Sequence, residues 1–234
     1  MGLSAHVMDL AYGSDIYFDI VAGIILLLAF VVVWKYYRIN KAQTKYKHLL
    51  IGFGMLFLSY LFKIISHFKI YYHSEYTHQV GMYTVTHHMV NASNILVYSG
   101  LLLHRILLIL GFYALYRTYS CKESRKTMLL TVFLLLAIGY LSASAYVVFH
   151  LTVLFILLTL TSTYMQRCKA DGSTRTKLLA YSFGILALSQ IIFFLTVFWI
   201  DLYFLGEFIQ LAGYFALLLT LLNVISYGKK ARPH

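Results

Sequence analysis

The chain has 234 residues, of which 61% are hydrophobic and only 12% are charged, and its formal net charge is +11 at pH 7. Because soluble domains have roughly 25% charged residues, this composition excludes an ordinary soluble domain and indicates a membrane protein. The apolar runs do not alternate with polar residues, which excludes a spanning β-barrel and predicts an all-α bundle.

Seven apolar stretches are each expected to cross roughly 30 Å of hydrocarbon as a helix that rises about 1.5 Å per residue. The fourth and fifth stretches are separated only by residues 142–145, so two crossings must share about 57 Å of helix. The first stretch lacks a basic leader and a small-residue cleavage site, and we expect a retained helix rather than a signal peptide. In chain order the stretches are residues 16–35, 49–68, 95–116, 127–142, 145–165, 178–200 and 203–226.

The basic residues predict the orientation of this single domain in the cell membrane. Of the 19 Lys and Arg, 16 lie in four alternate loops or ends, at residues 35–47, 117–126, 167–177 and 229–234. Since Lys and Arg concentrate on the cytoplasmic side, we expect the N-terminus outside and the C-terminus inside. The positive charge then contacts lipid head groups, and no nucleic-acid partner is expected. Cys121 and Cys168 lie on the same side, with no metal-binding spacing.

An internal repeat relates the two ends of the chain. Residues 44–59, TKYKHLLIGFGMLFLS, align without a gap to residues 174–189, TRTKLLAYSFGILALS, with eight identities in 16 positions. Residues 110–118 match residues 212–220 at four of nine positions. We interpret the matches as a parallel duplication, in which helices 1 to 3 (about 16–116) repeat as helices 5 to 7 (about 145–226) and helix 4 is the connector. Parallel repeats of this kind commonly place a ligand site between the halves.

This 3+1+3 plan with an external N-terminus resembles the microbial opsins, the seven-helix receptors, and the sugar-transporter and PQ-loop proteins. It is also similar in general style to uncharacterised seven-helix proteins of archaea. The resemblance covers the whole chain as topology and stops at family-specific residues. The seventh stretch, YFLGEFIQLAGYFALLLTLLNVISY, has no lysine for a retinal Schiff base and no histidine for the zinc site of seven-helix hydrolases. PQ-loop helices are kinked by prolines, whereas Pro233 is the single proline of this chain.

Nine polar residues fall within the predicted helices at central or outer depth. A charge there costs about 2.5 to 3.5 kcal/mol on insertion scales, so such residues usually face the bundle interior and pair. Because they gather at one depth, we expect them to line an outward-opening polar pocket, whereas each alone is as well explained by helix packing. These candidate ligand-binding residues are Asp19, Lys63, His67, His104, Arg105, His150, Gln190, Glu207 and Gln210.

Opposite charges among these residues predict buried ion pairs. Arg105 and Glu207 occupy equivalent positions in the repeat, and a pair between them would cross the interface between the halves. Asp19 and Lys63 lie at similar height on neighbouring helices and form a second expected pair. A Lys63–Glu207 pair is the competing arrangement, and Lys63 and His67 also have the option of snorkelling to the outer head groups. The many aromatic residues are interpreted as packing points and interfacial belts.

The long outer loop suggests a metal site. Imidazole binds zinc and copper, so an extracytoplasmic copper or zinc site is one interpretation, although the spacing matches no defined motif. A solvated, partly helical loop, or a lid over the bundle, is the alternative. The histidines concerned are His73, His78, His87 and His88.

The predicted helices contain one candidate pair of haem ligands. His104 and His150 are the one pair with comparable depth for bis-histidine haem. No nucleophile, base and acid recur at a catalytic spacing, so we predict no cofactor and no catalytic residue.

These observations favour a receptor-like membrane protein that binds a small ligand in the outward pocket and signals through a separate cytoplasmic partner. A small-molecule or proton-coupled transporter is the alternative, and its coupling groups would be Asp19, Glu207 and His150. A metal- or haem-binding membrane enzyme or redox subunit is the third possibility.

Overall fold

A computed structural model of the chain describes residues 3–39, 43–73, 79–80, 83–84, 92–118, 125–142, 146–172 and 174–230. Within these residues the chain forms seven helices and one small hairpin. The helices are α1 (Leu3–Ile39), α2 (Thr44–His73), α3 (Ala92–Arg117), α4 (Arg125–Leu141), α5 (Tyr146–Asp171), α6 (Thr174–Leu195) and α7 (Leu202–Lys230). The hairpin pairs β1 (Gln79–Val80) with β2 (Tyr83–Thr84) in antiparallel register.

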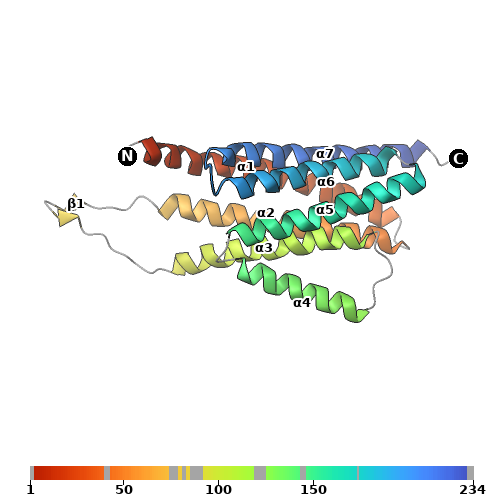
Figure 1. The fold of residues 1–234 in the computed structure, drawn as a ribbon, viewed down its shortest axis with the longest axis horizontal. Helices are drawn as coiled ribbons and strands as arrows, with labels where there is room; N and C mark the ends of the chain where they lie inside the picture. Colours follow the sequence, from red (N-terminus) through yellow and green to blue (C-terminus); the bar gives the residue numbers. More distant parts are fainter. Residues whose placement is uncertain are drawn as a thin grey trace.

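The helices form an elongated bundle whose axes run along its length (Figure 1). Six of them close a ring in the order α1, α2, α3, α5, α6 and α7, because α7 packs against α1 and α3 packs against α5. The remaining helix, α4, lies at the periphery, where its contacts among the described elements are with α3 and α5. The ring encloses the core, and α4 is outside it.

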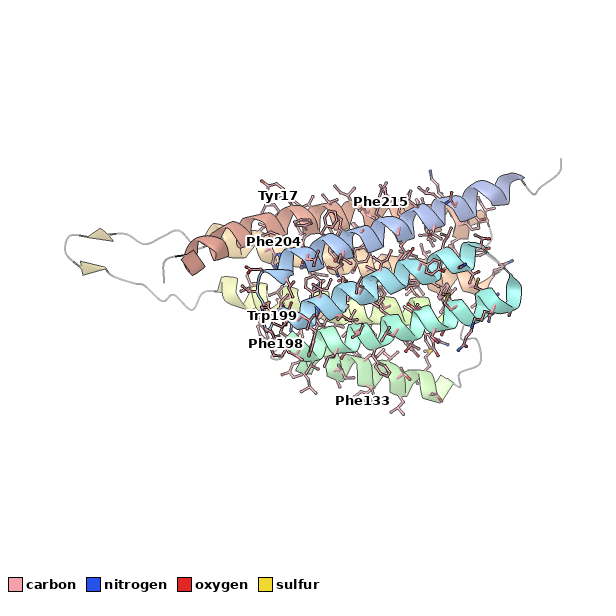
Figure 2. The ribbon with its side chains drawn as sticks, turned by 45° about the horizontal axis from the view of Figure 1, so that its top comes forward. Tyr17, Phe133, Phe198, Trp199, Phe204 and Phe215 are labelled. Carbon is pink, nitrogen blue, oxygen red and sulfur yellow. The ribbon has the colours of Figure 1, made fainter. Side chains whose placement is uncertain are left out.

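The exterior of the bundle is apolar, as a lipid bilayer requires. Six of the described helices, all but α4, are long and apolar enough to cross a membrane. Tyr17, Phe133 and Phe155 have exposed fractions of 73%, 65% and 76%, and Figure 2 shows labelled aromatic side chains pointing outward from several helices. The sequence prediction of a helical, multi-pass membrane protein is therefore supported at this level. The α4 helix has 17 residues, a length of about 25 Å, and is the shortest.

The helix boundaries differ from the predicted ones most informatively in α1 and α6. The first helix begins at Leu3, well before the apolar stretch, since a helix satisfies its own backbone hydrogen bonds outside hydrocarbon as well. The sixth helix ends at Leu195 rather than at residue 200, because the N–H groups of Phe198 and Trp199 both turn back to the carbonyl of Leu195. Of the outer loop at residues 73–93, the structure describes the last residue of α2, the short β1–β2 hairpin and the first residues of α3, and the rest of the loop lies outside the described residues.

Two close helix crossings involve matched pairs of leucine and glycine. A Cβ atom added to Gly111 of α3 would lie 2.9 Å from Cδ2 of Leu56 on α2. A Cβ atom added to Gly213 of α7 would lie 2.6 Å from Cδ2 of Leu186 on α6. Each glycine therefore admits a buried leucine against the helix backbone, which is the way small residues bring membrane helices together.

Candidate functional site

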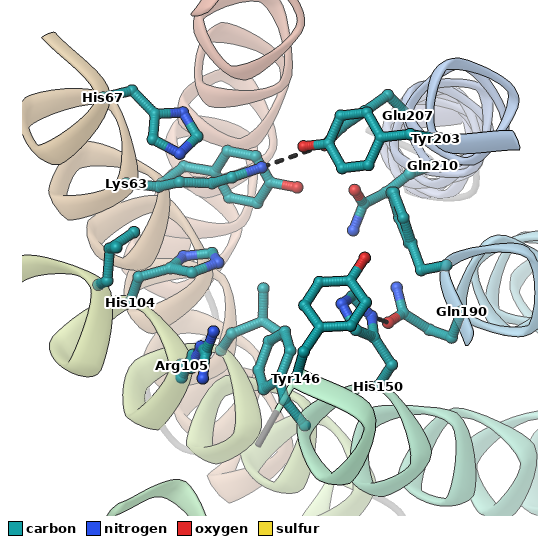
Figure 3. A pocket seen from close by; sticks show the side chains of 15 residues that line it. Lys63, His67, His104, Arg105, Tyr146, His150, Gln190, Tyr203, Glu207 and Gln210 are labelled. Carbon is teal, nitrogen blue, oxygen red and sulfur yellow. Dashed lines mark hydrogen bonds and ion pairs between the residues drawn. The ribbon is translucent and has the colours of Figure 1, made fainter. Parts of the chain in front are cut away.

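A cavity of about 210 Å³ lies inside the ring, between α2, α3, α5, α6 and α7. Its lining combines charged, amide, imidazole and aromatic side chains that face one another across the space (Figure 3). Eight of the nine residues proposed from the sequence line it, and the ninth, Asp19, lies directly behind Lys63 and His67. The eight are Lys63, His67, His104, Arg105, His150, Gln190, Glu207 and Gln210.

The lining residues lie toward the end of the bundle at which α1 begins, and Figure 1 shows that end by the label N. The cavity is lined by the later turns of α2 and α6 and by the earlier turns of α3, α5 and α7, which all meet at that end. The described Lys and Arg residues of the basic segments lie at the opposite end, in the last turns of α1, α3, α5 and α7 and the first turns of α2, α4 and α6. The polar cavity and the basic segments are thus separated along the bundle axis.

The most strongly charged part of the site is a cluster of Asp19, Lys63, His67 and Glu207. Nζ of Lys63 lies 2.6 Å from Oδ1 of Asp19, whose side chain is fully buried, and 3.2 Å from Oε1 of Glu207. Nδ1 of His67 lies 2.8 Å from the other oxygen of Asp19. The cluster joins α1, α2 and α7, and each buried acid has a cation beside it, as low-dielectric surroundings require.

The sequence left open whether Glu207 pairs with Lys63 or with Arg105, and the structure shows which pair forms. Asp19 pairs with Lys63 as expected, and Glu207 pairs with Lys63 rather than with Arg105. The hydroxyl of Tyr203, one turn before Glu207, donates to the same carboxylate oxygen at 3.1 Å. The predicted Arg105–Glu207 pair is therefore wrong within the described residues. Glu207 lies beside Lys63 of α2, whereas Arg105 donates to the Ser142 carbonyl.

Arg105 points instead toward the end of α4. Its Nη1 donates a hydrogen bond to the carbonyl of Ser142, and its guanidinium lies over the ring of Phe149, 5.3 Å from the centroid. Ser142 directly follows α4, so its carbonyl carries the partial negative charge of a helix C-terminus. The side chain thereby ties α3 to α4 while it lines the cavity.

His104 is held by a serine that the sequence analysis did not assign to the site. Its Nδ1 lies 2.7 Å from Oγ of Ser59 on α2, and Ser59 Oγ donates to the carbonyl of His104 at 3.0 Å. The imidazole also packs edge-on against Tyr60. Serine is a weak signal in a helix because its hydroxyl commonly bonds its own backbone.

His150 on α5 is held by Gln190 on the neighbouring helix α6. Nδ1 of His150 lies 2.8 Å from Oε1 of Gln190, and both side chains are buried. The Nε2 group of Gln190 donates to Oγ of Ser189 at 3.3 Å. This hydrogen bond joins α5 to α6 at the wall of the cavity.

Five aromatic residues of the lining were interpreted from the sequence as packing or belt residues. Tyr146 and Tyr203 precede His150 and Glu207 by four residues, so each shares a helix face with a polar residue of the site. That spacing was the signal available in the sequence. The five are Tyr60, Tyr146, Phe149, Phe193 and Tyr203.

The proposed metal site falls largely outside the described residues. His73 ends α2, and His78, His87 and His88 lie in the part of the outer loop that the structure does not describe. In the described ranges no group of three or more His, Cys, Asp or Glu is placed to hold a metal ion. His104 and His150, the pair considered for haem, both line the cavity with Nδ1 hydrogen-bonded as above.

Comparison of the chain with protein-family models, with curated proteins and with solved structures gives no match. Function is therefore inferred from the cavity itself. Its charged cluster, hydrogen-bonded imidazoles and aromatic walls are suited to binding a small polar molecule.

Proposed function

We propose that the protein crosses the cell membrane seven times and binds a small ligand, from the outside, in the cavity between its two halves. The protein acts as a receptor-like sensor without retinal. Ionisable residues in membrane helices commonly mark ligand or ion sites, because hydrocarbon penalises them strongly. The observation that carries the proposal is the gathering of polar groups from five helices around one cavity.

The orientation is supported by the separation of charge along the bundle. The described residues of the basic segments lie at the end opposite the cavity, and Lys and Arg concentrate on the cytoplasmic side of membrane proteins. The cavity then faces outward and the C-terminus lies in the cytoplasm. In this orientation α4 is the connecting crossing, and a helix of about 25 Å crosses by local thinning of the bilayer.

The duplication is supported by the two leucine–glycine crossings. The alignment of residues 44–59 with 174–189 matches Leu56 to Leu186, and the second match aligns Gly111 with Gly213. The two residues of each half meet in the same way, with the glycine of the third helix against the leucine of the second. The cavity then lies at the interface of two related three-helix units, where parallel repeats commonly bind their ligands.

In the sensing mechanism a ligand shifts the balance between two arrangements of the bundle. A molecule in the cavity contacts α2 and α3 from one half and α5, α6 and α7 from the other. It stabilises the arrangement that it binds more tightly, in which α3, α6 and α7 have moved relative to one another. These movements reach the basic cytoplasmic segments, where a separate signalling partner detects them.

Transport is the second candidate, favoured by the titratable groups at the cavity. Glu207 and His150 line it, and Asp19 is one contact away through Lys63. A carrier must also open the cavity inward, so flux of a bound molecule into proteoliposomes separates a carrier from a sensor. A metal or haem enzyme is separated from both by metal analysis and the optical spectrum of the purified protein.

The proposal is tested by filling the cavity. Leu101 lines it, whereas Leu103, on the same helix, has an exposed fraction of 40% on the lipid-facing exterior. A thermal-shift panel in detergent would contain benzoate, benzamide, benzylamine, butyrate, butyramide and butylamine. We expect at least one probe to stabilise the parent and Leu103→Trp but not Leu101→Trp. Stabilisation by none of the probes, or equal stabilisation of both variants, contradicts the proposal.

A further inference from the structure

The two cations that line the cavity differ in their partners. Lys63 has two carboxylates beside it, those of Asp19 and Glu207. Arg105 forms no ion pair with any residue that the structure describes, and its guanidinium contacts the Ser142 carbonyl and the Phe149 ring. Among the residues that the structure describes, no acid neutralises the positive charge of Arg105.

An anion in the cavity would supply what Arg105 lacks. The guanidinium has five N–H donors in a planar fork that matches a carboxylate, and one of its nitrogens already donates to Ser142. Figure 3 shows Arg105 beside Tyr146 and across the cavity from Glu207, so an anion bound there is on the side away from the competing carboxylate. Pairing a partly desolvated charge in this way is favourable because the alternative is an uncompensated ion.

The rest of the cavity lining indicates the size and polarity of the part of the ligand that is attached to the anionic group. The lining also has apolar and aromatic parts: Phe149 lies under the Arg105 guanidinium, and Leu101, Leu108 and Phe193 line the same cavity. The volume of about 210 Å³ lies below the roughly 300 to 1,000 Å³ of sites for drug-sized ligands. A short aliphatic chain or a single ring fits such a space.

We propose that the ligand is a small monocarboxylate with an apolar body, and that Arg105 binds its carboxylate. The proposal rests on the ligand-binding function argued above and specifies its chemical class. A dianion such as phosphate brings a second negative charge, whereas Lys63 is already shared by two acids. A primary amine brings a positive charge next to Arg105, which opposes its binding.

A purely structural role for Arg105 makes a different prediction, and α3 offers a matched control. Arg117 lies on the same helix and also donates to α4, through Nη1 to the sulfur of Met128, but it does not line the cavity. Replacing either arginine by glutamine removes one α3–α4 contact. Both replacements are therefore expected to lower the stability of the protein. A change in the preference for a negatively charged ligand is expected only when Arg105 is replaced.

The experiment compares each acid with its amide and its amine in the panel of six probes. The half-maximal stabilising concentration is measured for the parent, Arg105→Gln, Arg105→Lys and Arg117→Gln. In the parent and in Arg117→Gln we expect benzoate or butyrate to act at a concentration at least about tenfold below that of its amide. In Arg105→Gln this preference disappears, and in Arg105→Lys it is reduced, since lysine keeps the charge but not the fork.

The outcomes separate this proposal from the ligand-binding function. Binding of an amide or amine as tightly as the acid, blocked by Leu101→Trp, overturns the carboxylate assignment and leaves the ligand-binding function standing. An acid preference that persists in Arg105→Gln overturns the role of Arg105. Stabilisation by none of the six probes counts against both proposals.

Discussion

Lys63 on α2 and Glu207 on α7 are joined at the cavity, Nζ to Oε1 at 3.2 Å, although 144 residues separate them in the sequence. The same ammonium lies 2.6 Å from Asp19 on α1. One cation thus connects three helices of the ring. The net contribution of such a cluster to stability is small, because desolvation offsets attraction, but removing one member leaves the others uncompensated.

The first prediction concerns this cluster. Lys63→Met leaves two buried carboxylates without their ammonium, and Asp19→Asn leaves Lys63 and His67 without their fully buried acid. Each change is expected to lower the free energy of unfolding by roughly 3 to 5 kcal/mol. Titration with denaturing detergent, followed by circular dichroism, measures it. Asp201→Asn, at an exposed turn between α6 and α7, is the matched control and is expected to change it by less than about 0.5 kcal/mol.

If the Lys63 or Asp19 variants lose no more free energy of unfolding than Asp201→Asn does, these side chains reach water in solution. In that case the cluster is not the buried junction of α1, α2 and α7 described above.

The second prediction concerns the hydrogen bond between His150 and Gln190. His150→Leu leaves the buried amide of Gln190 without its partner at 2.8 Å, and should destabilise the protein by about 1 to 3 kcal/mol. The double variant His150→Leu/Gln190→Leu removes both polar groups and should lose less than the sum of the two single changes. A double-mutant cycle on the free energy of unfolding measures this coupling. Additive losses would contradict a direct contact.

The third prediction concerns the glycines at the two helix crossings. Gly111→Ala and Gly213→Ala place a methyl group within 3.0 Å of Leu56 and Leu186, and each should destabilise the bundle by about 1 to 3 kcal/mol. Gly184→Ala is the control on α6, where the nearest atom to the added Cβ is 3.9 Å away. Thermal unfolding midpoints of the three variants check it. If Gly111→Ala and Gly213→Ala behave differently from each other, the two crossings are not equivalent.

Much of the fold could be predicted from the sequence, because hydrocarbon imposes a simple requirement on it. The long apolar stretches correspond to helices in the structure. The basic segments between alternate stretches predicted that successive helices run in opposite directions. The gathering of Lys63, His104 and Glu207 at one cavity followed from the penalty for isolated ions at membrane depth.

The details of the site could not be predicted in the same way. The sequence left open whether Glu207 meets Lys63 or Arg105, because the choice depends on the rotation of α7 and the tilt of α3, which hydropathy does not encode. Ser59 was missed because a helical serine commonly bonds its own backbone, and Tyr203 was missed because its four-residue spacing from Glu207 was interpreted as packing. The end of α6 at Leu195 was missed because apolar residues continue through the turn that follows it.

The fourth prediction concerns orientation. With the basic segments in the cytoplasm, a green fluorescent protein fused after His234 should fluoresce, and an epitope tag placed before Met1 should be stained on intact cells. Staining of the N-terminal tag only after permeabilisation would show the reverse orientation, in which the cavity opens to the cytoplasm.

Reaction of a cysteine at Leu101 with a membrane-impermeant thiosulfonate tests the central claim most directly, in a background with Cys121→Ser and Cys168→Ser. Leu101 lines the cavity and Leu103, on the same helix, faces the lipid, so the two variants differ in access to water. Because the thiolate is the reactive form, it must be in water to react. Reaction of Leu101→Cys on intact cells, with none at Leu103→Cys, is the predicted result. No reaction at Leu101→Cys, or equal reaction at both positions, would contradict an outward-facing polar cavity.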